Sequence, residues 1–168
     1  MVPLLASSCG GSTPPKATGP SHRVAGPGFR FAVPDGWTTT QTGFAVVARQ
    51  PGEQEGPLVS ATAYRLTKPY SAALFTRAAR ELDGVAAKLA RASGGTVTES
   101  LTTTVDGQKI RAYRFTAHPA GKPSTDDRIG FVLEGRHEYQ LLCSVPAGAG
   151  DPDGACALLF GSFAAPLE

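Results

Sequence analysis

The stretch that decides the fold is Ser71-AALFTRAARELDGVAAKLARASGGTVTESLTTTVDGQKIRAYRFT-Ala117. Its first half predicts a helix that begins at an N-cap, Ser71, and ends at Gly94-Gly95. Apolar residues recur there at the helical spacing, namely Leu74, Phe75, Ala78, Leu82, Val85 and Leu89. Its second half predicts two strands, 96–105 and 108–117, which the tight turn Asp106-Gly107 joins into an antiparallel hairpin. A helix that packs beside such a hairpin indicates an α+β fold.

Further elements are predicted on both sides of this stretch. Alternating apolar and polar residues favour strands over 29–33, 44–49, 58–66, 128–133 and 137–145. The last two would form a second hairpin, and residues 155–163 predict a short closing helix with a buried apolar stripe. The resulting order is two or three strands, a long helix, four antiparallel strands and a closing helix. We therefore expect one antiparallel β-sheet flanked by helices.

Length and composition fit one domain with its own core. The chain has 168 residues, of which 41% are hydrophobic and 18% charged. We place the domain at 29–165 and interpret the Gly/Ser/Pro-rich residues 10–28, which include His22, as a flexible tether. A net charge of +2 without basic clusters argues against nucleic acid as a partner. The sequence lacks a run of 18 apolar residues, so no transmembrane segment is predicted.

Three cysteines leave one without an obvious partner. The simplest pairing is a disulfide between Cys143 and Cys156, which would stabilise the domain by about 3 kcal/mol and would indicate an oxidising compartment. Two buried free thiols are the alternative. A redox protein that uses the same pair is a weaker hypothesis, because the spacing lacks the CxxC form.

Cys9 is predicted to carry lipid. Ala6-Ser7-Ser8-Cys9 resembles the lipobox of bacterial lipoproteins, in which a signal peptidase cuts before the cysteine and the cysteine then receives fatty-acid chains such as palmitate. Residues 1–9 lack both a positive n-region and a full apolar h-region, so we expect them to be the remnant of a signal peptide that begins upstream of Met1. The alternative is a disordered N-terminus with a chance cysteine. More than one acyl chain would give stable membrane anchoring.

Three short segments carry a resemblance to a known family. Residues 31–37 (FAVPDGW), 107–115 (GQKIRAYRF) and 139–143 (YQLLC), the last followed by Cys156 and Ser162-Phe163, are similar to PsbP-like domains. That family includes the actinobacterial LpqN-type lipoproteins and the DcrB-like envelope proteins. The resemblance covers 29–163 and implies an α/β/α sandwich in an envelope protein. It also implies an accessory or binding role without a shared catalytic constellation.

Few residues suggest catalysis. An envelope hydrolase that uses His118 or His137 with Asp126 or Asp127 is the alternative function, although surface positions for the histidines and a solvated loop for Asp126-Asp127-Arg128 are the simpler interpretations. Residues 151–154 (DPDG) begin like a calcium loop but lack the later ligands, so we interpret them as a helix-capping turn. No metal or cofactor is predicted.

Three further side chains bear on a possible binding site. Trp37, the single tryptophan, is expected to pack in the core, and the wall of a ligand groove is the alternative. Arg111 and Arg114 are expected to point to opposite faces of the sheet. The sequence thus predicts an extracytoplasmic accessory protein, anchored to the cell membrane by lipid on Cys9, that binds an envelope protein, a lipid or a small molecule without catalysis.

Overall fold

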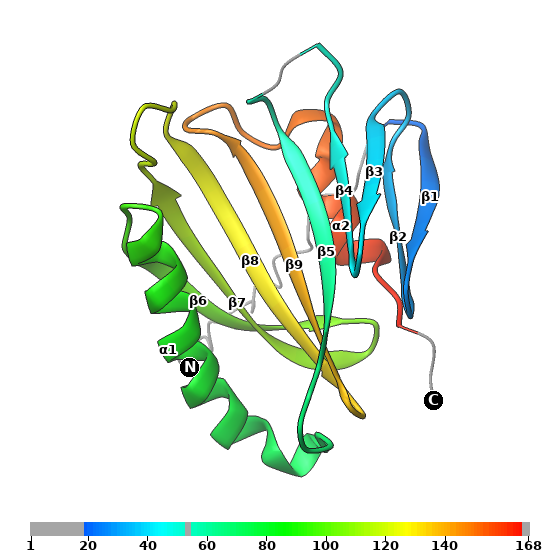
Figure 1. The fold of residues 1–168 in the computed structure, drawn as a ribbon, viewed down its shortest axis with the longest axis vertical. Coiled ribbons are helices and arrows are strands. Elements are labelled where there is room, and N and C mark those ends of the chain that lie inside the picture. The colour runs from blue at the N-terminus through cyan, green and yellow to red at the C-terminus, as the bar shows by residue number, and fades with distance from the viewer. Residues whose placement is uncertain (1–18, 53–54, 166–168) are drawn as a thin grey trace, which may run out of the picture.

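The computed structural model describes residues 19–52 and 55–165, so Cys9 and the first part of the predicted tether lie outside the described residues. Its centre is a seven-stranded antiparallel sheet with the order β3-β4-β5-β9-β8-β7-β6 (Figure 1). The strands are β3 (Thr38–Thr42), β4 (Ala45–Arg49), β5 (Leu58–Arg65), β6 (Val97–Val105), β7 (Gln108–Ala117), β8 (Thr125–Glu134) and β9 (His137–Pro146). The predicted α+β class is confirmed.

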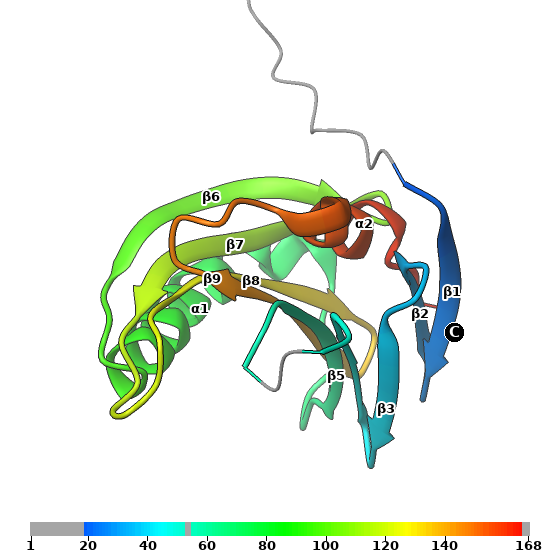
Figure 2. The ribbon, with the colours of Figure 1, turned by 90° about the horizontal axis from the view of Figure 1, so that it is seen from above.

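Helices cover both faces of this sheet. The helix α1 (Phe75–Ala92), preceded by the short turn η1 (Ala72–Leu74), lies on one face. The helix α2 (Ala155–Ser162), preceded by η2 (Pro152–Gly154), lies on the other, together with a separate hairpin of β1 (Ser21–Gly26) and β2 (Phe29–Pro34) (Figure 2). None of the described helices combines the length and apolar character needed to cross a membrane.

The two faces form two separate cores. The core on the α2 side includes Phe31, Val59 and Leu141, all with no exposed surface. The core on the α1 side is smaller and is built from one stripe of the helix and the strands under it, with Leu82, Ala86, Ala90, Tyr113, Ile129 and Phe131. Side chains alternate across a strand, so β7 sends Ile110 to one core and Tyr113 and Phe115 to the other.

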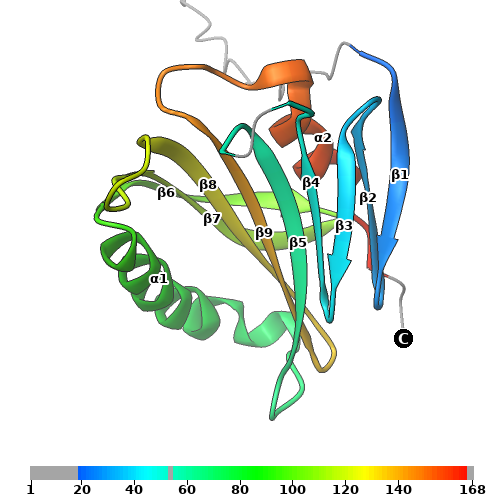
Figure 3. The same ribbon diagram turned by 45° about the horizontal axis from the view of Figure 1, so that its top comes forward.

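Each helix leaves part of its own face open. The helix α1 contacts β6 and β7, and Figure 3 shows β9, β5 and β4 beside it without a helix over them. The helix α2 makes most of its contacts with β2 and fewer with β5 and β9. The β6–β8 half of the sheet on the α2 side is therefore not fully covered.

Two strands and one boundary differ from the sequence prediction. Residues 21–26, which we placed in the tether, form β1 and pair with β2, and only Val24 packs against the core. Strand β3 was not predicted because all five of its side chains are exposed. Strand β8 begins at Thr125, inside an expected loop. These segments depend on backbone pairing, whereas the prediction relied on buried apolar side chains.

The predicted helix cap also differs. Ser71 precedes the short turn η1 and makes no side-chain capping hydrogen bond, and the α-helical residues start at Phe75. The predicted end is confirmed, because α1 stops at Ala92 and Gly94 adopts a positive φ of 78°. The backbone N–H of Gly95 donates to the carbonyl of Ala90 over 2.8 Å, which closes the last turn.

Candidate ligand-binding groove

A groove of about 860 Å³ opens between α2 and strands β6, β7 and β8. Small-molecule sites in proteins have volumes of roughly 300–1,000 Å³, so the groove could hold a ligand of ordinary size. It exists because α2 has only 8 residues and packs mainly over β2. The outer strands of the same face then have no helix above them.

The walls of the groove are largely apolar. Val105 and Val145 come from the sheet, and Leu158 and Phe160 come from α2. Gly130 on β8 allows the Phe160 ring to lie close, because a Cβ at that position would be 2.6 Å from Cε1 of the ring. Gly161 also lines the groove, and a Cβ added there would meet no atom within 4 Å.

A disulfide fixes the position of α2. Cys143 on β9 and Cys156 on α2 are bonded, with their Cα atoms 5.4 Å apart, as the sequence predicts. The carboxylate of Asp151 accepts hydrogen bonds from the backbone N–H groups of Cys156 (2.8 Å) and Ala157 (3.0 Å). Residues 151–154 are thus a helix-capping turn, as predicted. The Cys143, Asp151 and Cys156 ligand atoms lie within 4.8 Å of one another, but the disulfide and the cap already use them.

Arg128 is the unusual side chain of the groove. Its guanidinium carbon lies 4.0 Å from the centre of the Phe160 ring, and its Nε is buried without a hydrogen-bond partner. Burial lowers the pKa of Arg128, and the positive charge of Arg114 lowers it further, whereas Asp151 and Glu99 act in the opposite direction. An arginine stays charged in proteins at any ordinary pH, so the groove contains a fixed positive charge.

The neighbouring carboxylates are held by other groups. Asp126 accepts hydrogen bonds from the Gly148 N–H (2.9 Å) and the Thr116 hydroxyl (2.9 Å), which lower its pKa. Asp127 accepts one from the Ser144 hydroxyl (2.6 Å). Residues 126–128 belong to β8 and not to the solvated loop that the sequence predicts. Across the described residues, no ion pair involves Arg128.

The histidine–aspartate pairs of the alternative hydrolase are not assembled. His137 pairs with Glu134 in the β8–β9 ladder, whereas Asp127 pairs with Ser144, seven residues away along β9. Such a separation corresponds to about 23 Å in a strand. The Nδ1 atom of His118 lies 2.8 Å from the Ser124 hydroxyl, and the oxygens of Asp126 are occupied as described above. His22, in β1, lies 3.1 Å from Asp35.

Trp37 belongs to the core and not to the groove. Its side chain is 5% exposed, and its Nε1–H donates to the Asp153 carboxylate over 3.3 Å. Arg111 and Arg114 point to opposite faces of the sheet, as predicted. Arg114 pairs with Glu99 (3.3 Å) beside the groove, whereas Arg111 pairs with Asp83 (2.7 Å) on the α1 face.

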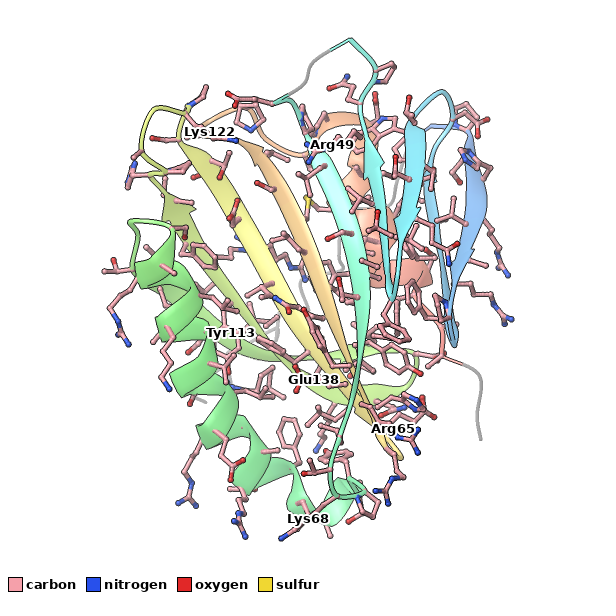
Figure 4. The ribbon with its side chains drawn as sticks, viewed as in Figure 1. Arg49, Arg65, Lys68, Tyr113, Lys122 and Glu138 are labelled. Atoms are coloured by element: carbon pink, nitrogen blue, oxygen red, sulfur yellow. A yellow bond between two sulfur atoms is a disulfide. The ribbon has the colours of Figure 1, made fainter. Side chains whose placement is uncertain are left out.

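The α1 face carries its own polar residues (Figure 4). The Tyr113 hydroxyl donates to Asp83 over 2.7 Å, and burial, followed by the hydrogen bond to Asp83, raises the pKa of Tyr113. Glu138 lies on β9, and burial raises the pKa of its carboxyl. Exposed cations lie toward the two ends of this face, with Arg49 and Lys122 at one end and Arg65 and Lys68 at the other.

Sequence reasoning did not identify the groove or Arg128 as its charged residue. A signal was available in the alternation of β8. Arg128 pairs with Arg114 across the β7–β8 ladder, so both side chains lie on the same face of the sheet. Because side chains alternate along a strand, the sequence would have placed Arg114 and Arg128 on one face of the sheet if β8 had been predicted to begin before residue 128.

Comparisons with known proteins support the fold. No family model matches the chain, and no curated protein is significantly similar in sequence. Among solved structures, cyanobacterial PsbP (CyanoP) from Synechocystis is 16% identical, with a TM-score of 0.59 over 95% of this chain and 98% of that protein. LpqN, involved in cell envelope biogenesis of Mycobacterium tuberculosis, is 14% identical, with a TM-score of 0.59 over 88% and 86%. A Bacteroides thetaiotaomicron protein is 11% identical, with a TM-score of 0.58 over 87% and 48%. The fold is PsbP-like.

Proposed function

We propose that this protein is an accessory binding module of the cell envelope that takes an amphipathic small molecule into the groove beside α2. The observation that carries the proposal is the open groove of about 860 Å³ with walls of Val105, Val145, Leu158 and Phe160. An apolar concavity of this size favours a lipid or metabolite, because a protein partner typically binds a flatter surface. The proposed role is binding, and we assign no catalytic step to the groove.

Three features support an extracytoplasmic location. The disulfide between Cys143 and Cys156 is typical of oxidising compartments. Cys9 follows a lipobox-like segment, so we propose that it carries the lipid that holds the domain at the membrane. One protein of similar fold, LpqN, is described as involved in cell envelope biogenesis.

A groove-filling variant tests the binding role. Gly161→Phe places a ring in the open space of the groove, whereas Gly84→Phe adds the same ring to α1, where a new Cβ also meets no atom within 4 Å. The probe is N-phenylnaphthylamine, a neutral dye whose fluorescence rises in apolar surroundings. We expect the wild-type protein and Gly84→Phe to bind it, and Gly161→Phe to lose most of the signal. Equal binding by the two variants would refute a site in this groove.

A separate measurement tests the anchor. The mass of the mature protein from its native envelope should include acyl chains on Cys9, and Cys9→Ser should move the protein from the membrane fraction to the soluble fraction. An unmodified Cys9 in the membrane fraction would contradict the proposed anchoring and would leave the groove experiment unaffected.

A further inference from the structure

We infer that the ligand of this groove carries an anionic head group, a carboxylate or a phosphate, on an apolar chain, and that Arg128 binds the head group. The inference rests on the proposed binding function of the groove. It adds the chemical class of the ligand and the residue that selects it.

The first step is the unpaired charge of Arg128. A buried Nε without a hydrogen-bond partner is unfavourable, and nearly all buried polar groups in proteins have a partner. The two terminal guanidinium nitrogens of Arg128 remain accessible, because Nε is the one atom of this side chain that is both buried and without a hydrogen-bond partner. Arg128 also lines the groove. An acceptor that enters the groove can therefore reach the accessible side of the guanidinium.

The second step is the state of the acidic groups nearby. Asp126, Asp127 and Asp151 all line the groove, and each accepts hydrogen bonds from protein groups other than Arg128. Arg114 adds a second positive charge on the same face and has one carboxylate, Glu99, as its ion-pair partner. These carboxylates keep their negative charges, so an anionic head group is favoured only beside Arg128. Among the described residues no carboxylate lies at ion-pair distance from Arg128, and the position beside its guanidinium is open to the head group of a ligand.

The third step is the orientation of the guanidinium. Its carbon lies 4.0 Å from the centre of the Phe160 ring, which is 7% exposed and therefore held in place by packing. A guanidinium that lies over an aromatic ring is restricted in its movement, and its parallel N–H groups match the two oxygens of a carboxylate or phosphate. Ala157 and Leu158 line the same groove, are partly exposed, and provide an apolar surface for the chain of the ligand.

The experiment uses the displacement of N-phenylnaphthylamine by ligands that share one twelve-carbon chain. Laurate and dodecyl phosphate carry the anionic head groups, dodecanol is neutral and dodecylamine is cationic. Acetate and inorganic phosphate test the head groups without a chain. All are used below their micelle-forming concentrations, on the full chain with the disulfide intact.

We expect the anionic amphiphiles to displace the dye at concentrations about tenfold lower than dodecanol, because a charge-assisted hydrogen bond discriminates by at least that factor. Arg128→Gln should bring laurate and dodecanol to within about twofold of each other while the dye still binds, and Arg128→Lys should retain part of the preference. Arg114→Gln is the matched control, with the expected loss limited to about threefold because the residue is exposed and already paired with Glu99.

The outcomes separate this inference from the proposed function. Equal displacement by laurate, dodecanol and dodecylamine would overturn the inference while the groove still binds the dye. A preference for anions that survives in Arg128→Gln would overturn the role of Arg128. Inorganic phosphate that competes as well as dodecyl phosphate would overturn the requirement for a chain. Absence of dye binding, or unchanged binding by Gly161→Phe, would refute the proposed function instead.

Discussion

The two helices cover opposite faces of one sheet and attach to it in different ways. Ala86 and Ala90 of α1 are fully buried, and these small residues allow the helix to approach Tyr113 and Phe131 closely. The shorter α2 is joined to β9 by the Cys143–Cys156 disulfide and leaves a groove of about 860 Å³ beside it. A helix that is held covalently does not need packing along its whole length, so part of its face can remain available to a ligand.

The arginines of the two faces show the same contrast. Arg111, under α1, is 16% exposed and forms a 2.7 Å ion pair with Asp83, which also accepts a hydrogen bond from Tyr113. Arg128, beside α2, has its guanidinium carbon 4.0 Å from the centre of the Phe160 ring and a buried Nε without a partner. The first arginine is satisfied within the domain and stabilises it. The second is incompletely satisfied, which is typical of residues that bind something else.

The largest expected effect comes from removal of the disulfide. Cys143→Ala/Cys156→Ala should lower the free energy of unfolding by about 3 kcal/mol, because the bridge closes a loop with a sequence separation of 13. Urea denaturation followed by the fluorescence of Trp37 measures this, since that residue packs on the α2 side. Amide exchange should accelerate mainly in α2. Equal acceleration in α1 would contradict the separate attachment of the two helices.

The second effect concerns the network under α1. Asp83→Asn should lower the free energy of unfolding by about 1–2 kcal/mol, because Arg111 loses its ion pair and Tyr113 loses its carboxylate acceptor. Glu81→Gln is the matched control on the same helix. Glu81 pairs with Arg77 at a largely exposed position, so the expected change is below about 0.5 kcal/mol. Similar losses in both variants would contradict a special role for Asp83.

The pH dependence of stability provides a check on the same carboxylate. Burial alone would raise the pKa of Asp83, but hydrogen bonds from Arg111 and Tyr113 and the charge of Arg111 lower it below its usual range. The contribution of Asp83 is therefore fully present above the unfolded-state pKa of about 3.9 and is lost as the pH falls toward the folded-state value. Asp83→Asn should lose less stability than the wild type between about pH 4 and pH 2. Parallel curves would contradict the lowered pKa.

The third effect has the opposite sign. Arg128→Leu should raise the free energy of unfolding by about 1 kcal/mol, because it replaces an incompletely paired charge with an apolar side chain against Phe160. Arg114→Leu, at an exposed position with Glu99 as partner, should give no such gain. Thermal denaturation without ligand measures both. A loss of stability in Arg128→Leu would mean that this arginine, like Arg111, serves the fold.

The sequence predicted the fold better than the site, and the reason is physical. The long helix, the hairpin at Asp106-Gly107 and the disulfide could be predicted, because apolar spacing, turn chemistry and cysteine pairing are local signals. Strand β3 has no buried side chain, so it left no apolar pattern. The groove depends on how far α2 extends over the sheet, and the isolation of Arg128 depends on which groups Asp126 and Asp151 contact. These are properties of tertiary packing, which one sequence does not display.

The smallest expected effect compares one glycine in each helix. Gly84 in α1 and Gly161 in α2 both have open space where a Cβ would lie, and neither has a positive φ. Alanine in a helix interior is more favourable than glycine by up to about 1 kcal/mol. Gly84→Ala should gain nearly that amount, because the residue lies in the middle of an 18-residue helix. Gly161→Ala should gain less, because only Ser162 follows it before α2 ends. Chemical denaturation of both variants measures the difference. A larger gain at Gly161 would mean that the end of α2 is already as firmly ordered as the centre of α1, and the contrast between the two attachments would then be confined to the disulfide.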